Sequence, residues 1–148
     1  MDRVEANLAV ARELGASMTV AVTGEGLAGA VLAVTGGPVA AVIDFVNNEL
    51  TASAAFDVLS KGGTMVQVGL FGGELTIPTA LLALKMITVQ GSFVGTLPEL
   101  GEVLELAKRG VVPRIPLIEE ELSLKGVTDS LDRLAAGGVA GRIVLKGE

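Results

Sequence analysis

The segment Gly24-Glu25-Gly26-Leu27-Ala28-Gly29 has the spacing of a G-x-G-x-x-G phosphate-binding turn. It follows a short apolar run, Thr19–Val22, and leads into an Ala- and Leu-rich run that is predicted to be a helix. In such a turn the first glycine permits a sharp bend, and the second lets a pyrophosphate approach the amides of the helix N-terminus. Asp44, fifteen residues beyond Gly29, could then bind the ribose hydroxyls. The segment therefore suggests a dinucleotide site, although Glu25 would place a negative charge beside the phosphates.

The residue types that are missing exclude most other chemistry. The 148 residues include no Cys, His, Trp or Tyr, which excludes disulfides, thiolate or imidazole zinc ligands, and triads with a histidine base. The net charge of -6 at pH 7 argues against binding to nucleic acid, whose phosphates would be repelled. Because the chain is 50% hydrophobic and only 19% charged, it can bury a core. Carboxylate, Lys, Ser/Thr or cofactor chemistry remains.

The composition also indicates the compartment. No apolar stretch approaches the roughly 20 residues that a membrane-spanning helix needs. Asp2 and Glu5 would interrupt the apolar core of a signal peptide at the N-terminus. We therefore expect no membrane association and a cytoplasmic location, with which the absence of Cys agrees.

The elements that must position these residues alternate between short strands and helices. Strands are predicted at residues 18–22, 39–45, 64–70, 86–93, 114–118 and 142–145. Helices are predicted from a capping box at Asp2 and Glu5 to Gly15, at 26–34, 49–60 and 78–84, between Thr96 and Gly110, and between Ser123 and Gly137. Glu119-Glu120-Glu121 is interpreted as a solvated turn. The alternation predicts an α/β fold with a doubly wound parallel sheet.

Five segments occur along the chain in a characteristic order. They are DRVEANLAVARELGA at 2–16, VAAVIDFV at 39–46, LSKGGTMVQVGLFGG at 59–73, ITVQGSFVGT at 87–96, and SLDRLAAGGVAGRIVLK at 130–146. In this order they resemble the medium-chain dehydrogenase/reductase family, the zinc-type alcohol dehydrogenases. The first is similar to the acidic end of the family's second Rossmann strand and the helix that follows. The others are similar to its fourth strand, its L-x-x-G-G-x-x-V-x-V-G strand and loop, its sixth strand, and its closing helix and strand.

The resemblance implies a truncated, Rossmann-like sheet that lacks the first strand–helix–strand unit. Residues 1–110 would form a partial NAD-binding domain, and residues 111–148 a tail that returns to a catalytic domain outside the chain. In this frame Gly24–Gly29 joins the third and fourth strands and is not the cofactor turn. Zinc would be bound in the missing domain, in agreement with the absence of Cys and His. The implied activity of the parent protein is hydride transfer between a small-molecule alcohol and a carbonyl compound with NAD, and the chain alone is predicted to be inactive.

The resemblance also assigns cofactor contacts to particular residues. Asp2 would bind the hydroxyls of the adenosine ribose and favour NAD over NADP, although the adjacent Arg3 could tolerate a 2′-phosphate. Arg142 would donate two parallel hydrogen bonds to the pyrophosphate. Backbone contacts to the nicotinamide carboxamide would come from two segments: Val68, Gly69 and Leu70, and Ser92, Phe93 and Val94. The strand Ile87–Ser92 would pair with its copy in a second chain, so we expect a homo-oligomer.

Two further functions remain open from the sequence. The chain could be a self-contained, non-catalytic dinucleotide-binding module with Gly24, Gly26 and Gly29 as its phosphate turn. It could also be a structural or oligomerising domain that binds no ligand. The two nucleotide-binding hypotheses differ in the carboxylate that binds the ribose, which is Asp2 in the dehydrogenase and Asp44 in the module.

Overall fold

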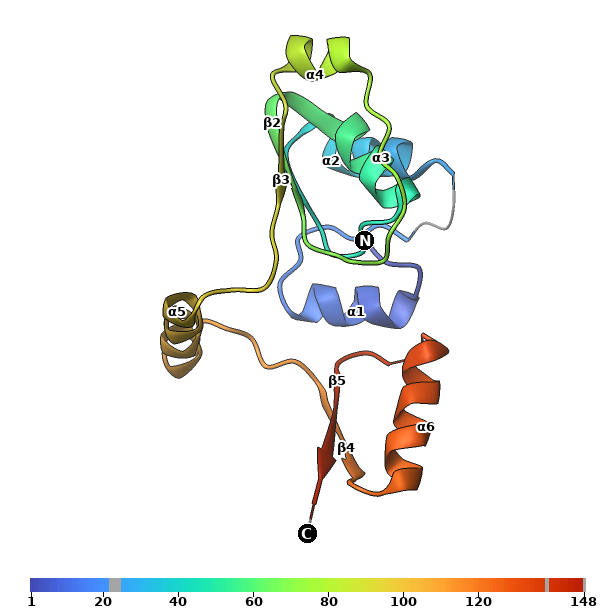
Figure 1. Ribbon diagram of the computed structural model, residues 1–148, viewed down its shortest axis with the longest axis vertical. Helices are drawn as coiled ribbons and strands as arrows, with labels where there is room; N and C mark the ends of the chain where they lie inside the picture. The colour runs from blue at the N-terminus through green and yellow to red at the C-terminus, as the bar shows by residue number, and fades with distance from the viewer. Residues whose placement is uncertain (22–24, 138, 148) are drawn as a thin grey trace. The chain divides into compact units, whose positions relative to one another are not determined.

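The computed structural model describes residues 1–21, 25–137 and 139–147 (Figure 1). The chain divides into two compact units. One consists of Met18–Thr96 together with Met1, and the other of Asp2–Ser17 together with Leu97–Glu148.

A three-stranded parallel sheet forms the centre of the first unit. Its strands are β1 (Val39–Asp44), β2 (Leu59–Gln67) and β3 (Thr88–Gly91), in the order β1-β2-β3. Asp44 at the end of β1 lies opposite Gln67, and Gln67 lies opposite Gly91 at the end of β3. The carboxyl ends of all three strands therefore meet at one edge of the sheet.

Helices α2 (Leu27–Thr35), α3 (Glu49–Val58) and α4 (Thr79–Lys85) belong to the same unit. α3 packs against β1, β2 and α2, and α4 contacts β2. The core consists of Ala55 from α3 with Leu59 and Met65 from β2. α3 begins with a capping box, because the Asn48 side chain accepts from the Thr51 amide and the Thr51 side chain accepts from the Asn48 amide. The α3 and α4 connections make β1–α3–β2–α4–β3 a pair of consecutive βαβ units, as the sequence predicts.

The second unit contains a smaller sheet. Strands β4 (Leu117–Glu121) and β5 (Arg142–Lys146) pair in parallel, and α6 (Leu124–Ala135) packs on both. Helices α1 (Glu5–Glu13) and α5 (Leu97–Lys108) complete the unit. Ser123 caps α6 by accepting a hydrogen bond from the Gly126 amide over 3.1 Å.

Several local predictions are wrong. Glu119-Glu120-Glu121 is not a turn but part of β4. Glu119 forms a salt bridge with Lys146, and Glu120 forms one with Arg133. The capping box at Asp2 and Glu5 is absent, because the N-cap of α1 is Val4, which has no side-chain capping bond. Residues 18–21 belong to none of the named strands, and Val22 lies outside the described residues. Within the described part of the chain, no helix is long and apolar enough to cross a membrane.

Candidate functional site

The carboxyl ends of β2 and β3 bring two sequence-predicted segments together. The Ser92 amide donates to the Gln67 carbonyl over 2.9 Å, so Val68–Leu70 and Ser92–Val94 continue from neighbouring strands. The side chains of Leu70, Phe93 and Val94 are 78%, 74% and 80% exposed. Ligands of open parallel α/β sheets bind at this edge, where Leu70 and residues 92–94 are exposed and Val68 and Gly69 are partly exposed.

A tight turn follows β1 beside these segments. The buried Asp44 accepts at Oδ1 from the amides of Val46, over 2.9 Å, and Asn47, over 2.8 Å. Asn47 adopts a left-handed backbone with φ of 58°, a conformation that Asn tolerates better than most residues. Asp44 is only 6% exposed, and its Oδ2 is buried without a partner among the described residues. Its carboxylate therefore shapes the turn and is not accessible to a ligand in solution.

Hydrogen bonds to this turn fix the direction of the peptide groups in Val68–Leu70. The Asp44 carbonyl accepts from the amides of Val68, over 2.9 Å, and Gly69, over 3.0 Å, and Asn47 Nδ2 donates to the Gly69 carbonyl over 3.0 Å. Because the peptide bonds are trans, the C=O and N–H of each unit point in opposite directions. The Val68 carbonyl therefore points away from Asp44, and the Leu70 amide points away from Asn47. One acceptor, the Val68 carbonyl, and one donor, the Leu70 amide, therefore face away from the turn. A carboxamide has the complementary groups, an NH₂ donor and a carbonyl acceptor.

The turn after β1 lies so close to residue 69 that only glycine fits at this position. A Cβ at this position would lie 2.3 Å from both the carbon and the oxygen of the Val46 carbonyl. These are backbone atoms, which cannot move aside as a flexible side chain could. The glycine thus allows the end of β2 to lie directly against the turn after β1.

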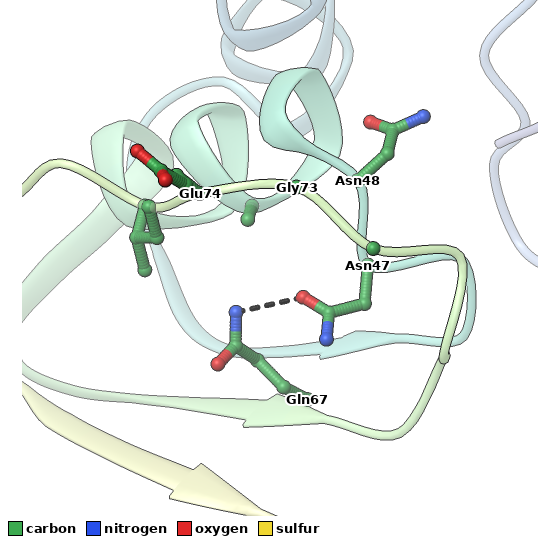
Figure 2. A pocket seen from close by; sticks show the side chains of 8 residues that line it. Asn47, Asn48, Gln67, Gly73 and Glu74 are labelled. Carbon is green, nitrogen blue, oxygen red and sulfur yellow. Dashed lines mark hydrogen bonds between the residues drawn. The ribbon is translucent and has the colours of Figure 1, made fainter.

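A small pocket lies beside the turn (Figure 2). Gln67 Nε2 donates to Asn47 Oδ1 over 2.8 Å, as the dashed line in Figure 2 shows. The pocket has a volume of about 230 Å³ and is lined by Asn47, Asn48, Ala52, Gln67, Gly72, Gly73, Glu74 and Leu75. Its volume is below the roughly 300–1,000 Å³ that is usual for small-molecule sites, so it cannot enclose a dinucleotide. Sequence reasoning missed Asn47 and Gln67; the signal that it passed over was the Asn47-Asn48 pair, which begins two residues after the strand predicted at 39–45.

Asp2 lies in the other unit, just before α1. Its Oδ1 accepts from the Val4 amide over 2.8 Å, and its Oδ2 accepts from Asn7 Nδ2 over 3.0 Å. Partial burial alone would raise the pKa of Asp2, but the hydrogen bonds from Val4 and Asn7 outweigh it and bring the pKa below 3.8. The carboxylate is therefore ionised at neutral pH. The neighbouring Arg3 is exposed.

Arg142 lies in the same unit as Asp2, at the start of β5. Its amide donates to the Pro116 carbonyl over 2.9 Å, and the residue is exposed. The preceding Gly141 has φ of 121°, and a Cβ there would lie 2.3 Å from the Pro116 oxygen. Gly141 thus has a backbone conformation that only glycine accommodates, and the exposed Arg142 follows it.

The glycine motif is only partly described. Gly24 lies outside the described residues. Gly26 is the left-handed N-cap of α2, and Gly29 lies within that helix.

The described residues form no metal site. Among residues 1–21, 25–137 and 139–147, no group of three His, Cys, Asp or Glu could hold an ion.

The sequence matches a known family over most of its length. The sequence profile of the zinc-binding dehydrogenases matches residues 1–109. The chain is 41% identical over 116 residues to an NAD-dependent alcohol dehydrogenase of Sulfolobus acidocaldarius, an alignment that covers 76% of the chain and 32% of that relative. It is 34% identical over 137 residues to an alcohol dehydrogenase of Geobacillus stearothermophilus, covering 93% of the chain and 39% of the relative.

A solved structure matches the fold. The alcohol dehydrogenase of the archaeon Aeropyrum pernix aligns with a TM-score of 0.83 and 32% identity, over 96% of this chain and 40% of that one. This match confirms the Rossmann-like α/β fold. The chain spans between about a third and two fifths of the length of these three proteins. It belongs to the zinc-binding dehydrogenase family, the zinc-type alcohol dehydrogenases among the medium-chain dehydrogenases/reductases.

Proposed function

We propose that the chain is the cofactor-binding portion of an NAD-dependent, alcohol dehydrogenase-like oxidoreductase that transfers hydride between an alcohol and a carbonyl compound. The observation that carries the proposal is the pair of backbone groups at the end of β2. The Val68 carbonyl and the Leu70 amide both point away from the β1 turn, beside the exposed segment Ser92–Val94. Such a pair fits the amide and carbonyl of a nicotinamide carboxamide. The bound NAD would carry the hydride, and this chain would bind and orient it.

Asp2 and Arg142 are proposed to contact the adenosine ribose and the pyrophosphate of the cofactor. Asp2 is ionised, and its two oxygens accept from the Val4 amide and from Asn7 Nδ2, which leaves acceptor capacity for ribose hydroxyls. Its charge would repel a 2′-phosphate, so NAD is favoured over NADP. Asp44 is a poorer candidate for this role because only 6% of it is exposed. Arg142 is exposed and offers the guanidinium that a pyrophosphate requires.

Zinc does not fit the residues of this chain, which has neither Cys nor His. In the proposal, any zinc is bound by other parts of the parent protein, and residues 111–148 return toward that catalytic part. The match of the family profile to residues 1–109 supports residues 1–110 as the cofactor-binding portion. The chain alone would then show no turnover of alcohol with NAD.

The test is to titrate the ¹⁵N-labelled chain with NAD⁺ and follow its amide resonances. We expect saturable shifts at Leu70, Phe93 and Val94 with millimolar affinity, because the phosphate turn of the family is proposed to lie outside this chain. NADH fluorescence provides a second readout against a dark background, since the chain has no Trp or Tyr. Unshifted resonances at these three amides would overturn the proposal. Micromolar binding with shifts centred on Gly26 and Gly29 would instead establish the self-contained module.

A further inference from the structure

We infer that Asn47 is a positioning residue whose side-chain amide sets the direction in which the Leu70 N–H is presented. The inference rests on the proposed function, because it assigns to Asn47 the geometry of the nicotinamide contact at the end of β2. Asn47 itself lies in the turn between β1 and α3, and it reaches residues 20 and 22 positions further along the chain.

Both the NH₂ donor and the oxygen acceptor of the Asn47 side chain form hydrogen bonds, and these bonds fix the orientation of the amide. The Gly69 carbonyl can only accept, so Asn47 must present its NH₂ group there, over 3.0 Å. The remaining oxygen then faces the Gln67 NH₂ group, which donates to it over 2.8 Å (Figure 2). Gln67 therefore holds the amide in the orientation that the Gly69 carbonyl requires.

The bond to Gly69 acts on the peptide group between Gly69 and Leu70, which the backbone bonds to the turn do not restrain. Backbone bonds already attach the segment to the turn, because the amides of Val68 and Gly69 donate to the Asp44 carbonyl and Phe71 donates to that of Val46. None of these bonds involves the peptide between Gly69 and Leu70. Since glycine rotates more freely than other residues, that peptide needs a further restraint, and Asn47 supplies it. The restraint turns the Gly69 carbonyl toward the turn and so directs the Leu70 amide away from it.

Asn48 offers a matched control at the next position. It lines the same pocket, but its side chain caps α3 by accepting from the Thr51 amide over 2.9 Å, a role that Asp fulfils as well as Asn. Asn47→Asp and Asn48→Asp make the same chemical change and add the same charge beside the same pocket. Only the first removes the donor to Gly69 and places a carboxylate oxygen against its carbonyl.

The experiment measures the affinity of the ¹⁵N-labelled chain for NAD⁺ and for AMP, which lacks the nicotinamide. Asn47→Asp is expected to weaken NAD⁺ binding at least about fivefold, the effect of losing one hydrogen bond, with AMP binding unchanged. Asn48→Asp is expected to leave both affinities unchanged. Equal NAD⁺ affinities for the two variants, or an equal loss of AMP binding in Asn47→Asp, would overturn the inference. Absent NAD⁺ shifts in the unmodified chain would instead overturn the proposed function.

A second variant covers the case in which Asn47→Asp does not fold. Asn47→Gly keeps the left-handed backbone available and removes only the side-chain amide. It should show the same selective loss of NAD⁺ affinity and a displaced Leu70 amide resonance before any ligand is added. If Asn47→Gly also loses its folded circular dichroism spectrum, Asn47 is a folding residue and the positioning role is rejected.

Discussion

Gln67 accepts from the Ser92 amide over 2.9 Å through its backbone carbonyl. Its side chain also donates to Asn47 over 2.8 Å. One residue at the end of β2 thus links the end of β3 to the turn after β1. The two segments proposed to contact the nicotinamide share this residue as their common support.

Replacing Gly69 by Ala tests how closely the end of β2 lies against the turn. The added methyl group would lie 2.3 Å from the Val46 carbonyl, so the backbone must shift. We expect a loss of about 1–3 kcal/mol in the free energy of unfolding, as for other overpacked sites. Urea unfolding followed by circular dichroism measures it. Gly91→Ala is the control, because no atom lies within 4 Å of a Cβ there; equal urea midpoints for the two variants would contradict the described approach.

Asp2→Asn tests the local role of that carboxylate through pH. Because the pKa of Asp2 in the folded chain lies below its ordinary 3.8, ionised Asp2 stabilises the fold above pH 3.8. This contribution disappears as the pH falls through the lowered pKa. The variant should therefore melt at a lower temperature than the unmodified chain at pH 7, and the difference should shrink steadily below pH 4. A difference in melting temperature that stays constant from pH 7 to about pH 2 would show that titration of Asp2 is not responsible.

The sequence predicts most elements because their signals are local. β1 is apolar up to Asp44 at its end, and Ser123 caps α6 as its position before the helix indicates. The start of β2 was not predictable in this way. The sequence predicts a helix at 49–60 and a strand at 64–70, yet α3 ends at Val58 and β2 begins at the fully buried Leu59. Burial of Leu59 extends the strand toward α3, and an irregular register between Val39 and Ala41 accommodates the extra residues.

The site was predictable only in part, for a similar reason. Consecutive βαβ units place the ends of successive parallel strands at one edge, so the proximity of Val68–Leu70 and Ser92–Val94 follows from the order of the strands. The contacts of Asn47 with Gln67 and Gly69 depend on the exact pairing of Asp44 with Gln67. That register is set by packing across the sheet, and no short motif encodes it.

The exposed edge of β3 predicts association between chains. All four residues Thr88–Gly91 are exposed, and an exposed edge strand with no charge invites pairing with another strand. Light scattering at tens of micromolar should find dimers or larger species. Val89→Lys, at a side chain that is 40% exposed, should yield monomers with an unchanged circular dichroism spectrum.

Leu100→Lys is the control for association through another apolar surface. Leu100 lies on α5 and is 54% exposed. If this variant dissociates the chains and Val89→Lys does not, association occurs through α5 and the strand prediction is wrong. A monomeric unmodified chain would also contradict the prediction.

Arg142→Gln tests the proposed pyrophosphate contact. Charge-assisted hydrogen bonds contribute about 1.5–3 kcal/mol, so the variant should bind NAD⁺ about tenfold more weakly or worse. Stability should not change, because β5 is attached through the Arg142 backbone amide, which donates to the Pro116 carbonyl. Arg133→Gln removes the same charge from α6, where it breaks the exposed pair with Glu120, and it should leave NAD⁺ affinity close to that of the unmodified chain. Nicotinamide alone, which carries no phosphate, should bind both variants equally. If the two variants lose NAD⁺ affinity to the same extent, net charge accounts for the effect and Arg142 has no specific contact with the pyrophosphate.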